Sequence, residues 1–288
     1  MTASANGPCS LIRLGPATCG RFIVGHNPPC GNSHLTDELN LEMKQYFTAD
    51  NAIGLYQRAE QLGCRTLMIR GDYRMLEWVE QYRRRGGKMN VLGQTASEMH
   101  DVFSNIKVMA AAGVQGVYHH GTQTDKFWRE NRIDDCLPYL KCMRDCGLAV
   151  GLGTHQSEII EYAEEHGWDV DFYMACLYNI SRVPRESAIV AGKTAYGQEI
   201  YLPEDRDRML DLIRAVPKPV LAFKILAAGR LCNTQEDVRQ AFHYTFSRIK
   251  PTDGVVIGLF PKSIDQVALD LAYAEEAAAA AAPGAAQR

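Results

Sequence analysis

The sequence lacks the features that mark several large classes of protein. None of its apolar runs approaches the roughly 18 residues that a membrane-spanning helix needs. Its first ten residues, MTASANGPCS, contain neither a basic segment nor an apolar one, so no secretory signal is expected. The net charge of −3 gives no sign of a basic surface for nucleic acid. These absences predict a cytoplasmic protein that binds neither membrane nor nucleic acid.

Two kinds of cofactor motif are also missing. The nine cysteines never occur as CxxC, so they are expected to be reduced thiols in the core or on the surface. Neither GxGxxG nor GxxxxGK[ST] is present, which excludes the common nucleotide-binding loops. Any cofactor must therefore be recognised in some other way.

What the chain does contain is a repeated pattern of eight short apolar runs separated by segments with helical patterning. The runs cover residues 21–25, 66–70, 89–94, 116–120, 148–155, 171–179, 220–223 and 254–260. This alternation predicts an α/β fold, a (β/α)₈ TIM barrel, with a short hairpin before the first barrel strand. We expect a flexible N-terminus over residues 1–9, one barrel domain over residues 10–275 and a frayed, alanine-rich tail over residues 276–288.

Most of the apolar runs end on polar residues. In a TIM barrel the active site lies at the C-terminal ends of the strands, so these residues are expected to surround it. The candidates are His26, Asn27, Arg70, Asp72, Gln94, His119, His120, His155, Asn179, Lys224 and Lys262. Because side chains alternate along a strand, only one of His119 and His120 is expected to face the site, and the sequence leaves open which one.

Three of the histidines suggest a metal site. His26, His119 and His155 follow three different strands and could together hold a divalent metal with an open position. The alternative is that each is a hydrogen-bonded residue of the pocket or its rim. Lys224, at the end of the seventh run, is expected to stabilise an anion, or less readily to act as a Schiff-base amine.

Several segments together resemble the aldo-keto reductases. LIRLGPATCGRFIVG is similar to that family's N-terminal hairpin and first strand, and AIGLYQRAEQLGCRTLMIRGDY to the segment that delivers its catalytic Asp and Tyr. GVYHHG resembles the strand that carries the active-site His, and LPYLKCMRDCGLAVGLGTHQSEIIEYAEE is the most specific match. YNISR, PVLAFKILAAGRL and GLFPKSIDQV resemble three later motifs in the same order.

The resemblance implies reduction of a carbonyl by NADPH. It assigns Tyr73 as general acid with Asp72 beside it, and His119 or His120 as the residue that orients the carbonyl. It assigns cofactor binding to Phe223, Lys262 and Ser263. Three positions depart from the family pattern: Arg70 replaces the Asp, Gln94 replaces the Lys, and Ala175 replaces the Gln that meets the nicotinamide.

The sequence therefore leaves three functional hypotheses. The first is an aldo-keto-reductase-like enzyme that acts on a small polar carbonyl or polyol, such as a sugar derivative, with NADPH. Its substrate would contact His26, Asn27, Arg70, Gln94, His155 and Asn179. The second is a cofactor-independent or metal-dependent lyase, isomerase or hydrolase that uses the histidines, and the third is a non-catalytic binding barrel. A small-molecule substrate is expected, and a homo-oligomer is compatible with the sequence.

Overall fold

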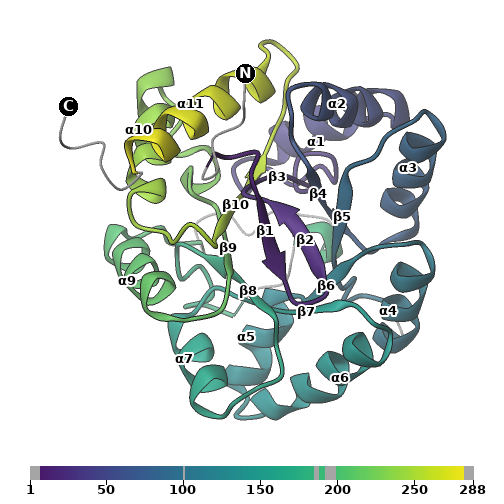
Figure 1. The fold of residues 1–288 in the computed structure, drawn as a ribbon, viewed down its shortest axis with the longest axis vertical. Helices are drawn as coiled ribbons and strands as arrows, with labels where there is room; N and C mark the ends of the chain where they lie inside the picture. The colour runs from purple at the N-terminus through teal and green to yellow at the C-terminus, as the bar shows by residue number, and fades with distance from the viewer. Residues whose placement is uncertain (1–6, 100, 185–187, 192–198, 282–288) are drawn as a thin grey trace.

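A computed structural model describes residues 7–99, 101–184, 188–191 and 199–281, and its centre is a closed barrel of eight parallel strands (Figure 1). In chain order the strands are β3 (Phe22–Gly25), β4 (Thr66–Arg70), β5 (Asn90–Gln94), β6 (Gly116–His119), β7 (Ala149–Thr154), β8 (Phe172–Cys176), β9 (Val220–Phe223) and β10 (Gly254–Gly258). Each pairs with the next, and β10 closes the ring on β3. The predicted TIM barrel is confirmed.

Helices surround the barrel, which explains why its strands are near-continuous apolar runs (Figure 1). They are α1 (Asp37–Tyr46), α2 (Ala49–Gln61), α3 (Tyr73–Arg84), α4 (Val102–Ala111), α5 (Gly121–Arg129), α6 (Leu137–Asp145), α7 (Ser157–Glu165), α8 (Ala188–Ala191), α9 (Pro203–Ala215), α10 (Gln235–Phe246) and α11 (Gln266–Ala280), with short 3₁₀ turns η1 (Ile133–Cys136) and η2 (Ala227–Gly229). In the described parts of the chain, none of them has the length and apolarity needed to cross a membrane.

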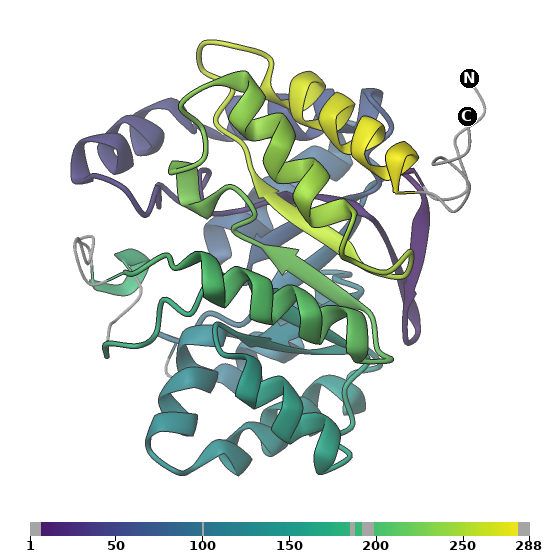
Figure 2. The ribbon, with the colours of Figure 1, turned by 90° about the vertical axis from the view of Figure 1, so that its left-hand side faces the viewer.

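The predicted N-terminal hairpin, β1 (Leu11–Leu14) and β2 (Ala17–Gly20), lies across one end of the barrel (Figures 1 and 2). Its side chains Ile12, Leu14 and Cys19 join the interior cluster of barrel residues. The Asn90 side-chain amide donates to the Thr18 carbonyl over 2.9 Å, at the start of β5. The hairpin therefore closes the N-terminal end of the barrel, and the C-terminal ends of the strands form the opposite, open end.

One expectation about local structure was wrong. The segment after β3 was expected to be an irregular loop, but it contains α1, whose N-cap Thr36 accepts a hydrogen bond from the Leu39 N–H. At the other end of the chain, α11 continues to Ala280, and its residues Ala277 and Ala278 pack into the core. Of the predicted flexible ends, residues 1–6 and 282–288 lie outside the described residues.

Candidate active site

A cavity of about 480 Å³ opens at the C-terminal end of the barrel and has two differently lined regions. We call the first the barrel mouth; it is lined by His26, Gln94, His120, His155, Phe223 and Lys224, which follow or end the strands. The second, the apolar arm, lies toward α1, α10 and α11 and is lined by Leu35, Leu39, Leu226, Val238, Phe260 and Ile264, with Asp270. The cavity therefore joins a polar catalytic region to a largely apolar extension.

A short contact beside the barrel mouth joins His155 to Asp125. The imidazole Nδ1 of His155 lies 2.6 Å from the Asp125 carboxylate, and the two residues are only 5% and 1% exposed. Because Asp125 engages Nδ1, proton exchange between this imidazole and the contents of the cavity would use Nε2. A carboxylate that fixes the tautomer of a histidine beside a cavity is the arrangement that general acid–base catalysis requires.

Helix α5 brings Asp125 to the end of β7. Gly121 and Asp125 are four residues apart and therefore lie on the same face of the helix. A Cβ atom at Gly121 would lie 3.1 Å from the Thr154 nitrogen and 3.3 Å from Cε1 of His155. The absence of a side chain at Gly121 thus lets α5 approach β7 closely enough for the carboxylate to reach the imidazole.

Two hydroxyl groups complete the surroundings of Asp125. Thr154 and Ser181 each donate a hydrogen bond to the carboxylate over 2.6 Å. Asn179, a predicted substrate-binding residue, lies outside the cavity lining and instead accepts from the Ser181 N–H over 3.2 Å. Burial by itself would raise the pKa of Asp125, but the charge and hydrogen bond of His155, with both hydroxyls, lower it below the ordinary value. Asp125 is therefore held ionised.

His119, the last residue of β6, and His120, the residue after it, face opposite sides of the barrel wall. His120 lines the cavity, and its Nδ1 lies 3.0 Å from the Ser97 hydroxyl. His119 points into the helix layer, where it stacks on Phe127 and Tyr139. Burial lowers the pKa of His119 to about 4, so this imidazole is neutral at physiological pH. The alternation rule holds, and it selects His120 for the cavity.

The predicted metal triad is therefore not formed. His119 cannot converge with His26 and His155, because its Nδ1 lies 2.8 Å from the Thr124 hydroxyl on the outer side of the wall. Across the residues that the structure describes, no three His, Cys, Asp or Glu side chains come together in a way that could hold a metal ion. The structure therefore does not support a metal site made of His26, His119 and His155.

Other predicted residues do lie around the barrel mouth. Burial, with the positive charges of Arg70 and Lys224, lowers the pKa of His26 to about 3, so His26 is neutral. The side-chain oxygen of Gln94 accepts a hydrogen bond from the Tyr118 hydroxyl over 2.7 Å. The amide nitrogen of Gln94 is the donor group of the same side chain. Arg70 is buried beneath the mouth and paired with Asp72 and Glu98, and it does not line the cavity.

Lys224 and Phe223 end β9 at the opposite wall. The backbone of Lys224 has a φ of 60°, a left-handed conformation that is uncommon for residues other than glycine and clusters at functional sites. Its ammonium nitrogen is buried at the cavity. The Phe223 ring meets the His155 ring edge-on, with the ring centroids 5.5 Å apart. These contacts place a positive charge and the imidazole around one cavity.

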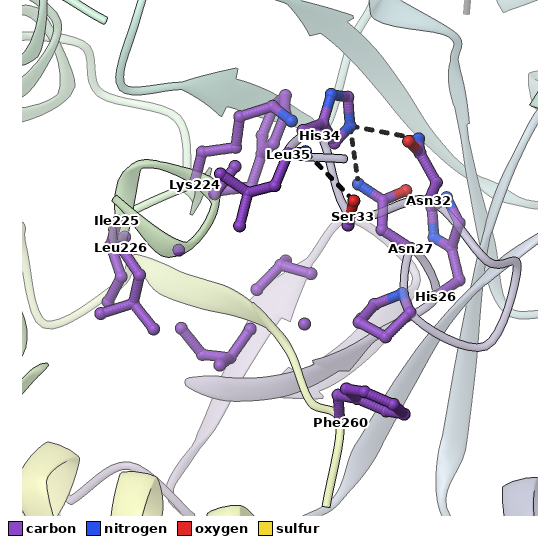
Figure 3. A pocket seen from close by; sticks show the side chains of 18 of the residues that line it. His26, Asn27, Asn32, Ser33, His34, Leu35, Lys224, Ile225, Leu226 and Phe260 are labelled. Carbon is purple, nitrogen blue, oxygen red and sulfur yellow. Dashed lines mark hydrogen bonds between the residues drawn. The ribbon is translucent and has the colours of Figure 1, made fainter. Parts of the chain in front are cut away.

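The loop after β3 contributes a second histidine–carboxylate pair. Nδ1 of His34 lies 2.8 Å from Glu199, and the side-chain amides of Asn32 and Asn27 lie 3.1 and 3.4 Å from its Nε2. Figure 3 shows these amides on one side of the cavity and Lys224, with the two residues after it, on the other. Because both ring nitrogens of His34 have neighbours within the protein, we assign it to holding the loop.

Of the residues that the resemblance to a reductase assigns to catalysis and cofactor binding, His120 and Phe223 line the cavity, whereas the others lie outside it. Tyr73 is 67% exposed at the start of α3, and Asp72 caps that helix by accepting from the Met75 N–H. Lys262 lies in a shallow surface depression with Ser263 and pairs with Glu42 over 2.7 Å. Neither Tyr73 nor Lys262 lines the cavity that contains His155.

The lining of the cavity contains few groups that could bind the phosphates of NADPH. Among the described lining residues, Lys224 is the single Lys or Arg, and the apolar arm adds the carboxyl group of Asp270. A dinucleotide phosphate needs several cations or helix N-termini around its phosphates. The first residues of α5, α10 and α11, namely Gly121, Gln235 and Gln266, also line the cavity, so helix N-termini are present beside Lys224 and NADPH binding stays a prediction.

Comparison with known proteins shows the fold. No protein-family model and no curated protein matches the sequence. Among solved structures, dihydropteroate synthase from Xanthomonas albilineans matches with a TM-score of 0.55 and 13% identity, over 96% of this chain and 99% of that one. A mandelate oxidase variant matches with a TM-score of 0.52 and 13% identity, over 97% and 80% of the two chains. A glycerol dehydrogenase from Gluconobacter oxydans matches with a TM-score of 0.45 and 14% identity, over 77% of this chain and 65% of that one.

These similarities support the TIM-barrel fold and nothing finer. At 10–13% identity a synthase and an oxidase can share the same barrel without sharing chemistry. The resemblance to the aldo-keto reductases therefore stays a prediction, and the function must be argued from the cavity.

Proposed function

We propose that the protein is an acid–base enzyme that removes a proton from the carbon next to a carbonyl group of a small substrate. Such a reaction belongs to an isomerase or a lyase and needs no nicotinamide cofactor. The observation that carries the proposal is the buried pair of Asp125 and His155 beside the cavity. It favours the second of the hypotheses that the sequence left open.

His155 would act as the base. In the neutral form of His155, Nδ1–H would donate to Asp125 and Nε2 would carry the lone pair that accepts the substrate proton. The imidazolium formed in this step is stabilised by the Asp125 carboxylate, which is held ionised by its hydroxyl donors. The same imidazolium can return the proton to a neighbouring carbon, which completes an isomerisation without any net change in the enzyme.

Lys224 and Gln94 would stabilise the enolate oxygen that develops when the proton leaves. The buried ammonium group of Lys224 supplies a positive charge at the cavity, and the Gln94 amide is oriented by its bond to Tyr118. Donors that are already in place where charge develops are worth more in a water-poor cavity than in solution. The left-handed backbone of Lys224 supports this role, because uncommon backbone conformations cluster at functional sites.

Hydrogen–deuterium exchange tests this proposal without a known substrate. The protein is incubated in D₂O with a panel of small ketones, aldehydes and hydroxycarbonyl compounds, and the loss of the α-proton signal is followed by ¹H NMR. We expect accelerated exchange for at least one compound. The variant His155→Gln should slow it by about 10²-fold or more, as expected for loss of a general base.

His119→Gln is the matched control, because it removes a buried histidine from the neighbouring strand outside the cavity. It should keep the rate within about threefold of the wild type, once thermal melting shows that both variants fold. The proposal is wrong if no compound exchanges faster than in buffer, or if His155→Gln leaves an accelerated exchange unchanged.

A further inference from the structure

The apolar arm contains one buried carboxyl group that the acid–base chemistry does not use. Asp270, on α11, is 7% exposed and lines the cavity. Within the described residues no side chain donates a hydrogen bond to its carboxyl group or forms an ion pair with it. The lining of the arm includes the apolar residues Leu226, Val238 and Phe260, together with the amides of Gln235 and Gln266. Asp270 is thus a nine-tenths buried polar group that faces a cavity without a donor from the described protein.

Such an arrangement is costly unless something else supplies the missing interaction. Burying a carboxylate away from water costs several kcal/mol when it has neither a hydrogen-bond donor nor a counter-charge. Native proteins contain few buried polar groups of this kind, and they are often explained by a ligand or an ion. Asp270 lines the cavity, so a ligand bound in the cavity could supply the missing partner.

We propose that the apolar arm is a binding subsite for the hydrocarbon end of a ligand that carries a protonated amine, with the ammonium group placed on the Asp270 carboxylate. The hydrocarbon part would lie against Leu226, Val238 and Phe260, where burial of its surface gives about 25 cal/mol per Å². The ammonium group would supply both the donor and the counter-charge that Asp270 lacks.

A cation fits this position better than a neutral hydroxyl group does. The one Lys or Arg among the described lining residues, Lys224, lies in the barrel mouth, so the arm itself offers no positive charge. Burial raises the pKa of Asp270 to about 7, so the carboxyl group is still ionisable near neutral pH and a nearby cation would favour its charged form. Amine binding in the arm does not depend on the role proposed for His155.

Binding of three hexane derivatives tests the proposal. Hexylamine, 1-hexanol and hexanoate share one hydrocarbon chain and differ in the charge of the end group. Isothermal titration at pH 8 should give the tightest binding for hexylamine, weaker binding for 1-hexanol and the weakest for hexanoate. The variant Asp270→Asn should weaken hexylamine binding by about tenfold or more and leave 1-hexanol within about threefold.

The matched control is Glu275→Gln on the same helix, which removes one negative charge from an exposed side chain. It should leave all three affinities unchanged. Cys232 lines the cavity within electrostatic reach of Asp270, so hexylamine should also slow alkylation of this thiol if it binds in the arm.

Three outcomes would overturn the inference. Equal binding of hexylamine by the wild type and Asp270→Asn would show that the carboxylate is not the amine site. Equal binding of 1-hexanol and hexylamine by the wild type would make the arm a site for neutral chains. No binding of any probe at millimolar concentration would show that the arm does not bind ligands of this size. A failure of deuterium exchange, in contrast, would bear on His155 alone.

Discussion

Asp125 and Asp270 are both buried beside the same cavity, yet their surroundings are opposite. Asp125, beside the barrel mouth, accepts hydrogen bonds from the hydroxyls of Thr154 and Ser181. It also accepts from the backbone and the imidazole of His155. Asp270, in the apolar arm, has no such donor among the described residues. Accordingly the pKa of Asp125 is lowered, whereas burial raises that of Asp270 to about 7. Burial alone therefore does not decide the state of a carboxyl group; its partners do.

The difference suggests a division of labour within one cavity. A carboxylate that the protein fully satisfies has a fixed charge and can orient the imidazole beside it. A carboxyl group that the protein leaves unsatisfied can respond to what enters the cavity. Substitutions that change one member of this pair at a time should separate the two roles, with effects that range from a loss of activity to a small change in stability.

Replacing Asp125 by Asn should have the largest effect. An amide cannot stabilise the imidazolium as a carboxylate does, and it can hold His155 in the wrong tautomer, so the exchange rate should fall by about 10³-fold. The rate is measured by ¹H NMR with the carbonyl compound that the wild type exchanges. Asp270→Asn, measured with the same amine-free compound, should remain within about threefold of the wild type. An equal loss in both variants would remove the distinction between the two aspartates.

Replacing Asp270 by Asn should stabilise the protein, and by an amount that depends on pH. The raised pKa means that the unfolded chain loses its proton near pH 4, whereas the folded protein keeps it until about pH 7. Stability is thus lost as the pH rises from about 4 to 7, and above pH 7 the full penalty of about 4 kcal/mol applies. The variant should therefore be more stable at pH 8 by up to this amount and nearly neutral at pH 4.

Chemical denaturation of the wild type and the variant at pH 4, 6 and 8 checks this prediction. The thiol of Cys232, within electrostatic reach of Asp270, does not interfere, because desolvation and the negative charges of Asp270 and Asp237 raise its pKa to about 11. A stability difference that is the same at all three pH values would show that Asp270 keeps an ordinary pKa in the folded protein.

Most of the fold could be predicted from the sequence, because each barrel strand is marked by a short apolar run of consecutive residues. A parallel strand buried on both faces is a short apolar run, and all eight runs proved to be strands. The helix α1 was missed because its helical pattern follows two prolines and a glycine, which favoured an irregular loop over residues 26–50. Thr36 followed by Asp37 and Glu38 was the start signal that could have located it.

The candidate site could be predicted only in part. The rule that strand ends surround the site correctly brought His26, His120, His155 and Lys224 to one cavity. Asp125 was missed because it lies in a helix after a strand end, and its carboxylate reaches His155 across 30 residues of sequence. A signal was present, since Gly121, Thr124 and Asp125 form a buried face at helical spacing, and a buried Asp needs a partner.

The apolar arm could not be predicted at all. Its walls come from α1, from the loops after β9 and β10, and from α10 and α11, and these segments meet only in the folded barrel. In the sequence each supplies one or two apolar residues, which are indistinguishable from ordinary core positions. Asp270 likewise gives no signal in the sequence, because an acidic residue is normally expected at the surface.

A smaller effect is expected for Ser181→Ala, which makes Asp125 slightly more like Asp270. The change removes one hydroxyl donor at 2.6 Å from the carboxylate and leaves the other donors in place. A hydrogen bond to a charged group contributes about 2 kcal/mol, so denaturation should show a loss of about that size. The exchange rate should fall far less than in Asp125→Asn. A loss as large as that of Asp125→Asn would show that the hydroxyl has a direct part in the chemistry.

The smallest effect is expected for Gly121→Ala, which tests whether the close approach of α5 positions Asp125. A Cβ at 3.1 Å from the Thr154 nitrogen requires α5 to move by a few tenths of an ångström, which should cost about 1 kcal/mol of stability. The matched control is Gly54→Ala in α2, where no atom lies within 4 Å of the added Cβ. There alanine should stabilise the protein by up to about 1 kcal/mol, because it favours the helix. If the close approach of α5 positions Asp125, Gly121→Ala should slow deuterium exchange and Gly54→Ala should not. If both variants keep the wild-type rate, the pair of Asp125 and His155 tolerates a shift of α5.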